Sequence, residues 1–144
     1  MDQDIAYEDE IKLGMTGTYT KRITSDDVER YAQVTGDYNP LHMNEDFAKT
    51  TQFKGRIAHG MISAGLISAC LSTTYPGPGA VHLGQTLKFV KPVYINDTLR
   101  ARVKVIDIIP KEKFKIIVLS TDVINQDNEI VTTGEAQLMT AKRK

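Results

Sequence analysis

The sequence is short of cysteine and has no excess of either charge, and each shortage excludes a class of protein. Cys70 is the single cysteine, so the chain forms no internal disulfide and has no cysteine-based metal site. A reducing cytoplasm is the simplest setting for such a chain. Lys plus Arg and Asp plus Glu number 18 each, and the longest basic run is residues 142–144. This balance argues against nucleic acid or an anionic membrane as the main partner.

Long apolar runs, repeats and linkers are also missing. No window approaches the roughly 20 apolar residues that a membrane-spanning helix needs, and the acidic start of the chain does not resemble a secretory signal. We find no internal repeat and no low-complexity segment. Because 144 residues can bury one core but not two, we expect a single soluble domain over residues 1–144.

The first half of the chain predicts one strand and then helices. Residues 16–23 are rich in Thr and Tyr, which favours an edge strand. A hydroxyl followed by acidic residues at positions 24–27 predicts a helix start, and Gly36 ends that helix. Residues 37–40 follow as a turn, because Pro40 lacks an N–H and forces the residue before it out of the helical region.

The rest of the chain predicts a sheet around one buried helix. Asn44 can cap a short helix over residues 45–51. Residues 60–71 are apolar on every face of a helix, which indicates a helix buried on nearly all sides. Four β-rich segments also stand out, at residues 81–89, 98–109, 114–124 and 129–140. We therefore expect an α+β layout, an antiparallel sheet of about five strands wrapped around the helix, which is the shape of a hot-dog fold.

Polar groups gather in two places between residues 31 and 68. Asp37 and His42 flank one tight turn, and a carboxylate and an imidazole in that arrangement can share one water molecule. Gly60 opens the apolar helix, so it can offer a backbone N–H to an oxygen without side-chain obstruction. The combination indicates chemistry with water.

Several segments resemble one enzyme family, the MaoC-like, (R)-specific enoyl-CoA hydratases. Tyr31, Gly36-Asp37, Asn39-Pro40-Leu41-His42 and Ala58-His59-Gly60-Met61 are similar to its hydratase motif, and residues 76–79 and 87–93 also resemble it. The resemblance runs over essentially the whole chain. It implies a hot-dog fold, a homodimer, and reversible addition of water to a trans-2-enoyl thioester, giving the (R)-3-hydroxyacyl product. It implies no cofactor, since coenzyme A is part of the substrate.

The resemblance also assigns site residues. Asp37 and His42 match the catalytic pair, and Gly60 matches the residue whose N–H polarises the thioester carbonyl. Ser68 matches a serine near the aspartate better than Ser63 does. Chemically, we expect Asp37 to take a proton from water, His42 to hold and polarise that water, and one of the two to protonate Cα.

Other polar residues have weaker claims. We place Asn39 beside the substrate, and Lys88 and Lys91 are candidates for the coenzyme A phosphates, although solvated lysines are as common. His59 is interpreted as a structural or capping histidine. Asp37, His42 and His59 are potential metal ligands, but their spacing is not typical of a metal site, and we expect no metal.

Three alternatives to an enoyl-CoA hydratase stay open at the level of sequence. A hot-dog acyl-CoA thioesterase would direct the water at the thioester carbon. An (R)-3-hydroxyacyl dehydratase would run the same chemistry on an acyl carrier protein. A non-catalytic subunit would only bind an acyl thioester. The sequence does not reveal the preferred acyl length, nor whether the pathway is polyhydroxyalkanoate synthesis or fatty acid metabolism.

Overall fold

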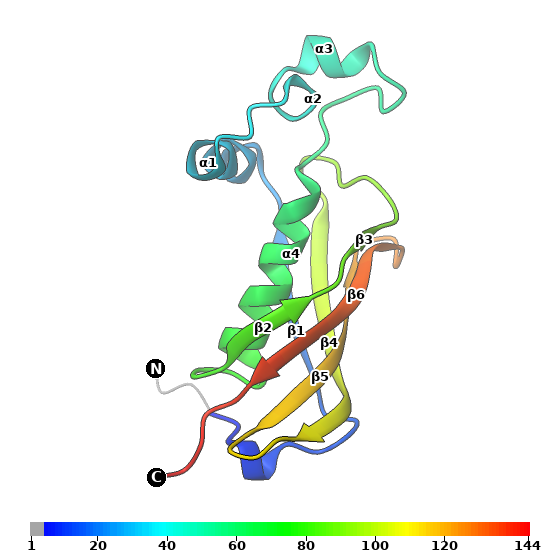
Figure 1. Ribbon diagram of the computed structural model, residues 1–144. Coiled ribbons are helices and arrows are strands. Elements are labelled where there is room, and N and C mark those ends of the chain that lie inside the picture. The colour runs from blue at the N-terminus through cyan, green and yellow to red at the C-terminus, as the bar shows by residue number, and fades with distance from the viewer. Residues whose placement is uncertain (1–4) are drawn as a thin grey trace.

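The computed structural model describes residues 5–144 and contains one antiparallel sheet with a long helix lying against it (Figure 1). The strands are β1 (Thr16–Arg22), β2 (Val81–Gln85), β3 (Lys88–Phe89), β4 (Thr98–Pro110), β5 (Lys115–Ile124) and β6 (Ile130–Met139). Their order across the sheet is β1-β4-β5-β6-β2, and β3 also pairs with β6. The predicted α+β layout is confirmed.

The single strand expected at residues 81–89 is two strands instead. β2 and β3 both pair with β6 but are separated at residues 86–87, where Thr86 N–H donates to the Glu135 carbonyl at 2.9 Å. The residue before Glu135 is Gly134, and only glycine fits there, because a side chain at this position would overlap the Thr86 carbonyl. This close approach lets the chain turn between the two short strands, and the β-rich composition did not reveal it.

The core lies between the sheet and one face of helix α4 (Gly60–Ala69). β4 alternates between exposed residues and the buried Leu99, Ala101, Val103 and Val105, as its sequence predicts. Leu66 and Ile67 of α4 are buried against this sheet. The helix continues beyond Ala69 as one wider π-helical turn, η2 (Cys70–Thr74).

The prediction that this helix is buried on nearly all sides is wrong for the single chain. Met61, Gly65 and Ser68 are exposed, and their i, i+4, i+7 spacing places them on one face. Periodicity reports which faces are apolar, but the sheet of one chain covers only the other side of α4. In the part of the chain that the structure describes, no helix is long and apolar enough to span a membrane.

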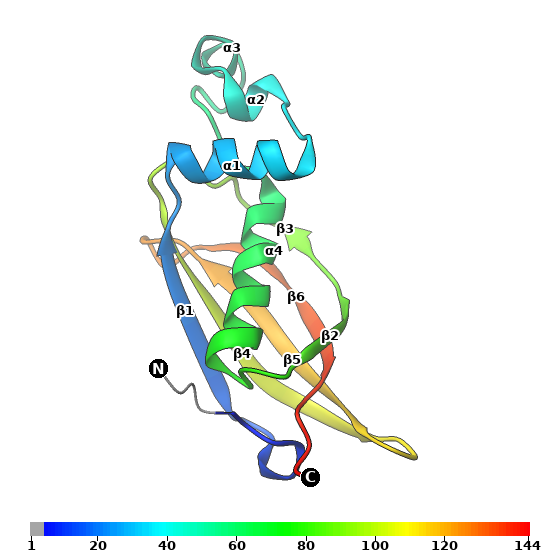
Figure 2. The same cartoon turned by 90° about the vertical axis from the view of Figure 1, so that its left-hand side faces the viewer.

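Three helices stand beyond the N-terminal end of α4, away from most of the sheet (Figures 1 and 2). They are α1 (Ser25–Thr35), α2 (Pro40–Met43) and α3 (Glu45–Lys49). We call residues 25–59 the helical arm, and β1–β6 with α4 the sheet body. A short 3-10 turn, η1 (Glu8–Glu10), precedes β1.

Candidate active site

The turn between α1 and α2 presents Asp37 and is built from local hydrogen bonds. Gly36 ends α1 in the left-handed conformation, with φ of 83°, as its position predicts. The Asn39 side chain caps α2 by accepting from the Leu41 N–H at 3.0 Å. Asn39 N–H in turn donates to Asp37 Oδ1 at 3.3 Å. Asp37 is exposed, so its carboxylate can reach a small molecule beside the arm.

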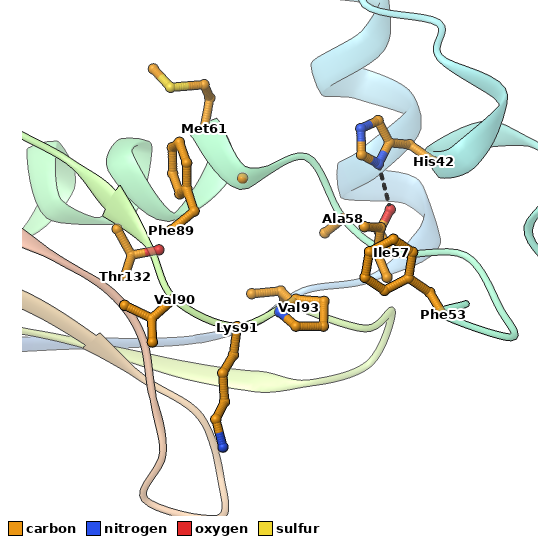
Figure 3. Close-up of a pocket in the computed structure, with 12 residues that line it drawn as sticks. His42, Phe53, Ile57, Ala58, Met61, Phe89, Val90, Lys91, Val93 and Thr132 are labelled. Carbon is orange, nitrogen blue, oxygen red and sulfur yellow. Dashed lines mark hydrogen bonds between the residues drawn. The ribbon is translucent and has the colours of Figure 1, made fainter. Parts of the chain in front are cut away.

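His42 lies on α2 rather than in loop, and its tautomer follows from one contact. Its Nδ1 lies 2.8 Å from the carbonyl oxygen of Ile57 (Figure 3). A carbonyl only accepts hydrogen bonds, so Nδ1 carries the proton and the neutral ring keeps its lone pair on Nε2. Arg56 holds the same turn of helix, because its Nε–H donates to the His42 carbonyl at 2.6 Å. His42 therefore presents a fixed proton acceptor.

His59 is almost completely buried, with 2% of its surface exposed. Its ring lies between Tyr31, at 4.5 Å between ring centres, and His42, at 4.1 Å. Its Nε2–H donates to the backbone carbonyl of Asp37 at 2.9 Å, while its buried Nδ1 has no partner among the described residues. Burial lowers the pKa of His59. The hydrogen bond to the Asp37 carbonyl opposes this shift, whereas the charge that His42 can carry lowers the pKa further.

The alternative of a capping role for His59 is wrong. No side chain within residues 5–144 caps the N-terminus of α4. The amide of Gly60 likewise has no hydrogen-bond acceptor among these residues. The Gly60 N–H, at the start of the ten-residue α4, is therefore without an acceptor among these residues and lies at the positive end of the helix dipole.

Contacts on both sides hold Gly60 in place. The Ser63 hydroxyl donates to the Gly60 carbonyl at 2.6 Å and lies 2.7 Å from Thr132 Oγ1 on β6. On the other side, a Cβ added at Gly60 would lie 3.1 Å from a ring carbon of Phe89. Gly60 is thus needed for this close approach, and Ser63 fastens the first turn of α4 to the sheet.

A cavity of about 430 Å³ opens beside His42 and Gly60. Figure 3 shows its walls, with Met61 and Phe89 on one side and His42 and Phe53 on the other. The lining is mostly apolar, and it is completed by Ile57, Ala58, Val90, Lys91, Pro92, Val93 and Thr132. Asp37 does not line the cavity itself, but one oxygen of its carboxylate lies within 4.8 Å of a ring nitrogen of His42. His42 and Gly60 therefore line the same apolar cavity, and the Asp37 carboxylate lies beside His42.

The four residues predicted to bind substrate lie in different places. Asn39 uses its side chain as a helix cap. Ser68 is exposed on α4, eight residues or about 12 Å along the helix from Gly60, and does not line the cavity. Lys91 lines it, but its amine points away and pairs with Glu129 (Figure 3). Lys88 lines a separate depression on the sheet. Their binding roles stay predictions.

A metal could draw on three side chains here. Asp37, His42 and His59 each offer one ligand atom, and these atoms lie within 4.8 Å of one another. Two imidazoles on one tetrahedral zinc ion diverge, which separates their ring centres by roughly 5 Å. The centres of the His42 and His59 rings are 4.1 Å apart with 36° between the ring planes, so the two rings pack directly against each other instead. This differs from a preformed zinc site, and the expectation of no metal stays a prediction.

The comparisons with known proteins agree with this geometry. A family model described as a MaoC like domain matches residues 8–128. The chain belongs to the MaoC-like domain family. Within this family, it is 44% identical over 142 residues to an (R)-specific enoyl-CoA hydratase of Rhodospirillum rubrum, covering 99% of this chain and 96% of the relative. It is 41% identical to a 3-hydroxybutyryl-CoA dehydratase of Methylorubrum extorquens, covering 97% of this chain and 87% of the relative.

Solved structures of MaoC-like proteins have the same fold. An unliganded R-hydratase of Pseudomonas aeruginosa superposes with a TM-score of 0.90 at 41% identity, covering 96% of this chain and 88% of that one. An (R)-hydratase of Aeromonas caviae gives a TM-score of 0.84 at 34% identity, with 92% and 98% covered. The predicted family and the predicted hot-dog fold are confirmed.

Sequence reasoning assigned no site role to Tyr31, His59, Ser63 or Thr132. Two signals were present. Ser63 is a hydroxyl within an otherwise apolar helical run, three residues after Gly60. His59 directly precedes Gly60, so any role for the Gly60 amide places an imidazole one residue away. Thr132 is in a β-rich segment whose register with α4 no local pattern reveals.

Proposed function

We propose that this protein is an (R)-specific enoyl-CoA hydratase, a hydro-lyase that reversibly adds water to trans-2-enoyl-CoA to give (R)-3-hydroxyacyl-CoA. The observation that carries the proposal is an apolar cavity lined by His42, whose Nε2 keeps its lone pair, and by Gly60, with the Asp37 carboxylate beside His42. Relatives of 44% and 41% identity over nearly the whole chain carry hydratase and dehydratase names, which supports the same assignment.

Water is activated between the two side chains. His42 Nε2 accepts a hydrogen bond from the water and orients it, since the Ile57 carbonyl fixes the ring through Nδ1. The Asp37 carboxylate removes one proton as the water oxygen forms its bond to Cβ of the enoyl group. Asp37 then returns that proton to Cα. Both new bonds form on one face of the double bond, and the carboxylate is regenerated.

The thioester oxygen becomes negative between these two steps. In this proposal the Gly60 N–H donates to it, assisted by the dipole of α4, and the lack of another acceptor for this amide among the described residues supports the role. Removing such a donor typically raises the barrier by about 3 kcal/mol. The proposed chemistry uses no metal and no cofactor other than the coenzyme A of the substrate.

The cavity accounts for the uncharged part of the substrate. Its apolar walls suit an acyl thioester and the adjoining arm of coenzyme A. Lys91, at its rim, is better placed than Lys88 for a phosphate, and would exchange its Glu129 partner for it. Replacing Lys91 by Met should raise KM for crotonyl-CoA and leave kcat nearly unchanged, and an unchanged KM would remove this residue from the binding site.

The assembly is proposed to be a homodimer. Val81 and Leu83 on β2 are 50% and 47% exposed, and Met61 on α4 is 50% exposed. β2 also lies at the edge of the sheet, so its outer backbone groups can pair with another strand. A second copy covering this edge would also cover Ser68, on the same face of α4 as Met61. Light scattering should give the mass of two chains, and the monomer mass would contradict the proposal.

One assay tests the function. Purified protein is mixed with crotonyl-CoA, the enoyl absorbance is followed, and the alcohol product is separated on a chiral column. Loss of absorbance with formation of the (R)-alcohol is expected. Free coenzyme A thiol would identify a thioesterase, an (S)-alcohol would contradict the stereochemistry, and no turnover would favour a binding subunit. Crotonyl thioester on an acyl carrier protein, run in parallel, tests the dehydratase alternative, a name that a relative of 34% identity carries.

A further inference from the structure

Three aromatic rings from three parts of the chain pack together in the site, with planes tilted by 47° between Tyr31 and His59 and by 36° between His42 and His59, and we call this arrangement the ring stack. Tyr31 comes from α1, His42 from α2, and His59 from the residue before α4. His59 is the middle ring, at 4.5 Å from Tyr31 and 4.1 Å from His42 between centres. It is also the only one of the three that is fully buried. The His42 ring therefore has a rigid neighbour against one of its faces.

His59 touches the other functional groups as well. Its Nε2–H donates to the Asp37 carbonyl at 2.9 Å, so it holds the backbone of the turn that presents the carboxylate. It is also bonded directly to Gly60 in the chain, and Gly60 is the first residue of α4. One side chain thus contacts the ring of His42 and the backbone of Asp37, and it is fixed to the start of the helix that carries the amide.

His59 is poorly suited to exchange protons itself. Nε2 is occupied by the Asp37 carbonyl, and Nδ1 is buried without a partner among the described residues. A second proton on Nδ1 would create a buried charge packed against His42, with Tyr31 as the other ring in contact and the Asp37 carboxylate as the nearby anion. The ring is therefore neutral and acts through its shape and its single N–H.

We propose that His59 is a positioning residue of the hydratase: by stacking on His42 and bonding to Asp37, it holds both in register with the Gly60 amide. The inference rests on the proposed function. Misplacement of reacting groups by about 1 Å can lower a rate roughly a hundredfold, so a side chain that sets this register has a large effect without touching substrate.

The test uses His59→Leu and His59→Gln. Leu removes both the stack and the N–H, and kcat is expected to fall about a hundredfold with KM changed less than threefold. Gln removes the stack but keeps an amide N–H where Nε2 was, so kcat should recover to within about tenfold of the wild type. Equal activity of both variants, or a value of kcat for His59→Leu within threefold of the wild type, would overturn the proposal.

Two further measurements separate positioning from stability. In a His42→Ala background, His59→Leu should lower kcat by a smaller factor than in the wild type, because one of the two groups that it positions is gone; full additivity of the two losses would contradict the inference. Val103→Ala is the matched control: it also removes buried atoms, from β4, and should keep the wild-type kcat per folded molecule. Tyr31→Leu, which loosens the stack from its outer side, gives the same comparison if His59→Leu does not fold.

A spectroscopic readout keeps this inference distinct from the proposed function. Long-range ¹H–¹⁵N spectra of the three histidine rings should show His59 as the neutral Nε2–H tautomer at pH 6.5, and His59→Gln should shift the ring signals of His42 but not those of His82. An unchanged His42 ring would overturn the positioning role. A wild-type protein that shows these signals but no turnover of crotonyl-CoA would instead refute the hydratase assignment alone.

Discussion

The helical arm and the sheet body are held together in different ways. The sheet body buries large apolar side chains completely, among them Leu99, Leu119 and Leu138. The arm buries only Val28, Ala32 and Ala48 from its three helices, and α2 contributes none. What orders the arm is a set of caps, backbone hydrogen bonds and the ring stack. Asp37 and His42 are therefore carried by a region without a core of its own, whose buried Val28 and Ala58 join the core of the sheet body, while Gly60 belongs to α4 of that body.

The largest expected effect is a loss of stability from a substitution in the sheet body that leaves the catalytic rate unchanged. Leu119→Ala, in the centre of β5, removes fully buried methyl groups and should lower the free energy of unfolding by about 2–5 kcal/mol. Urea denaturation followed by circular dichroism measures this. The kcat per folded molecule should stay within about twofold of the wild type. If catalysis fell with stability, the two regions would be coupled more tightly than the contacts indicate.

The arm should show the opposite behaviour. Asp37→Asn and His42→Ala should each lower kcat for crotonyl-CoA at least about a hundredfold, because each removes a group that handles the water proton. The melting temperature should change little, since Asp37 is exposed and His42 only half-buried. Val34→Ala, at an 86% exposed position of α1, is the control within the arm. Near-normal turnover in either variant would remove that residue from the mechanism.

Where the helical arm joins α4, a single added methyl group should lower kcat. Gly60→Ala places a Cβ 3.1 Å from the Phe89 ring, and we expect kcat to fall about tenfold as Phe89 is pushed into the cavity. Adding Phe89→Leu should restore most of the loss, because the smaller side chain leaves room. No recovery in the double variant, measured beside Phe89→Leu alone, would show that the methyl group acts by another route.

The smallest expected effect is a decrease in the stability of the folded chain at acidic pH. Burial lowers the pKa of His59 in the folded chain from its ordinary value of 6.5, so the unfolded chain binds a proton that the folded chain does not. The stability from the neutral ring is complete above pH 6.5 and is lost as the pH falls from there toward the folded pKa. Urea midpoints at pH 7.5 and 5.5 should therefore differ more for the wild type than for His59→Gln. An equal difference would mean that His59 is not buried neutral.

The sequence predicted the regular parts of both regions well. The alternation over residues 98–109 and the turn residues Gly36 and Pro40 are local signals, and the strand and helix boundaries follow them closely. Asp37, His42 and Gly60 were chosen from their chemistry and from the family motif, and the fold puts Asp37 beside His42 and lines one cavity with His42 and Gly60. Their catalytic roles stay predictions.

What the sequence did not predict depends on contacts between distant residues. His59 lies 17 residues from His42 along the chain, and no periodicity indicates that their rings stack. Ser63 and Thr132 are separated by 69 positions, yet they share a hydrogen bond of 2.7 Å. The exposed face of α4 has a similar origin, because apolarity does not reveal whether this chain or another one covers it.

The bond from His42 Nδ1–H to the Ile57 carbonyl has a consequence for motion. That bond is present whether the imidazole carries one proton or two, so a proton can arrive at Nε2 and leave again while the ring keeps its orientation. A histidine that had to rotate between its donor and acceptor states would add a reorganisation step to every turnover. Here the His42 ring is already oriented toward the water before the proton is transferred, so no reorientation is needed.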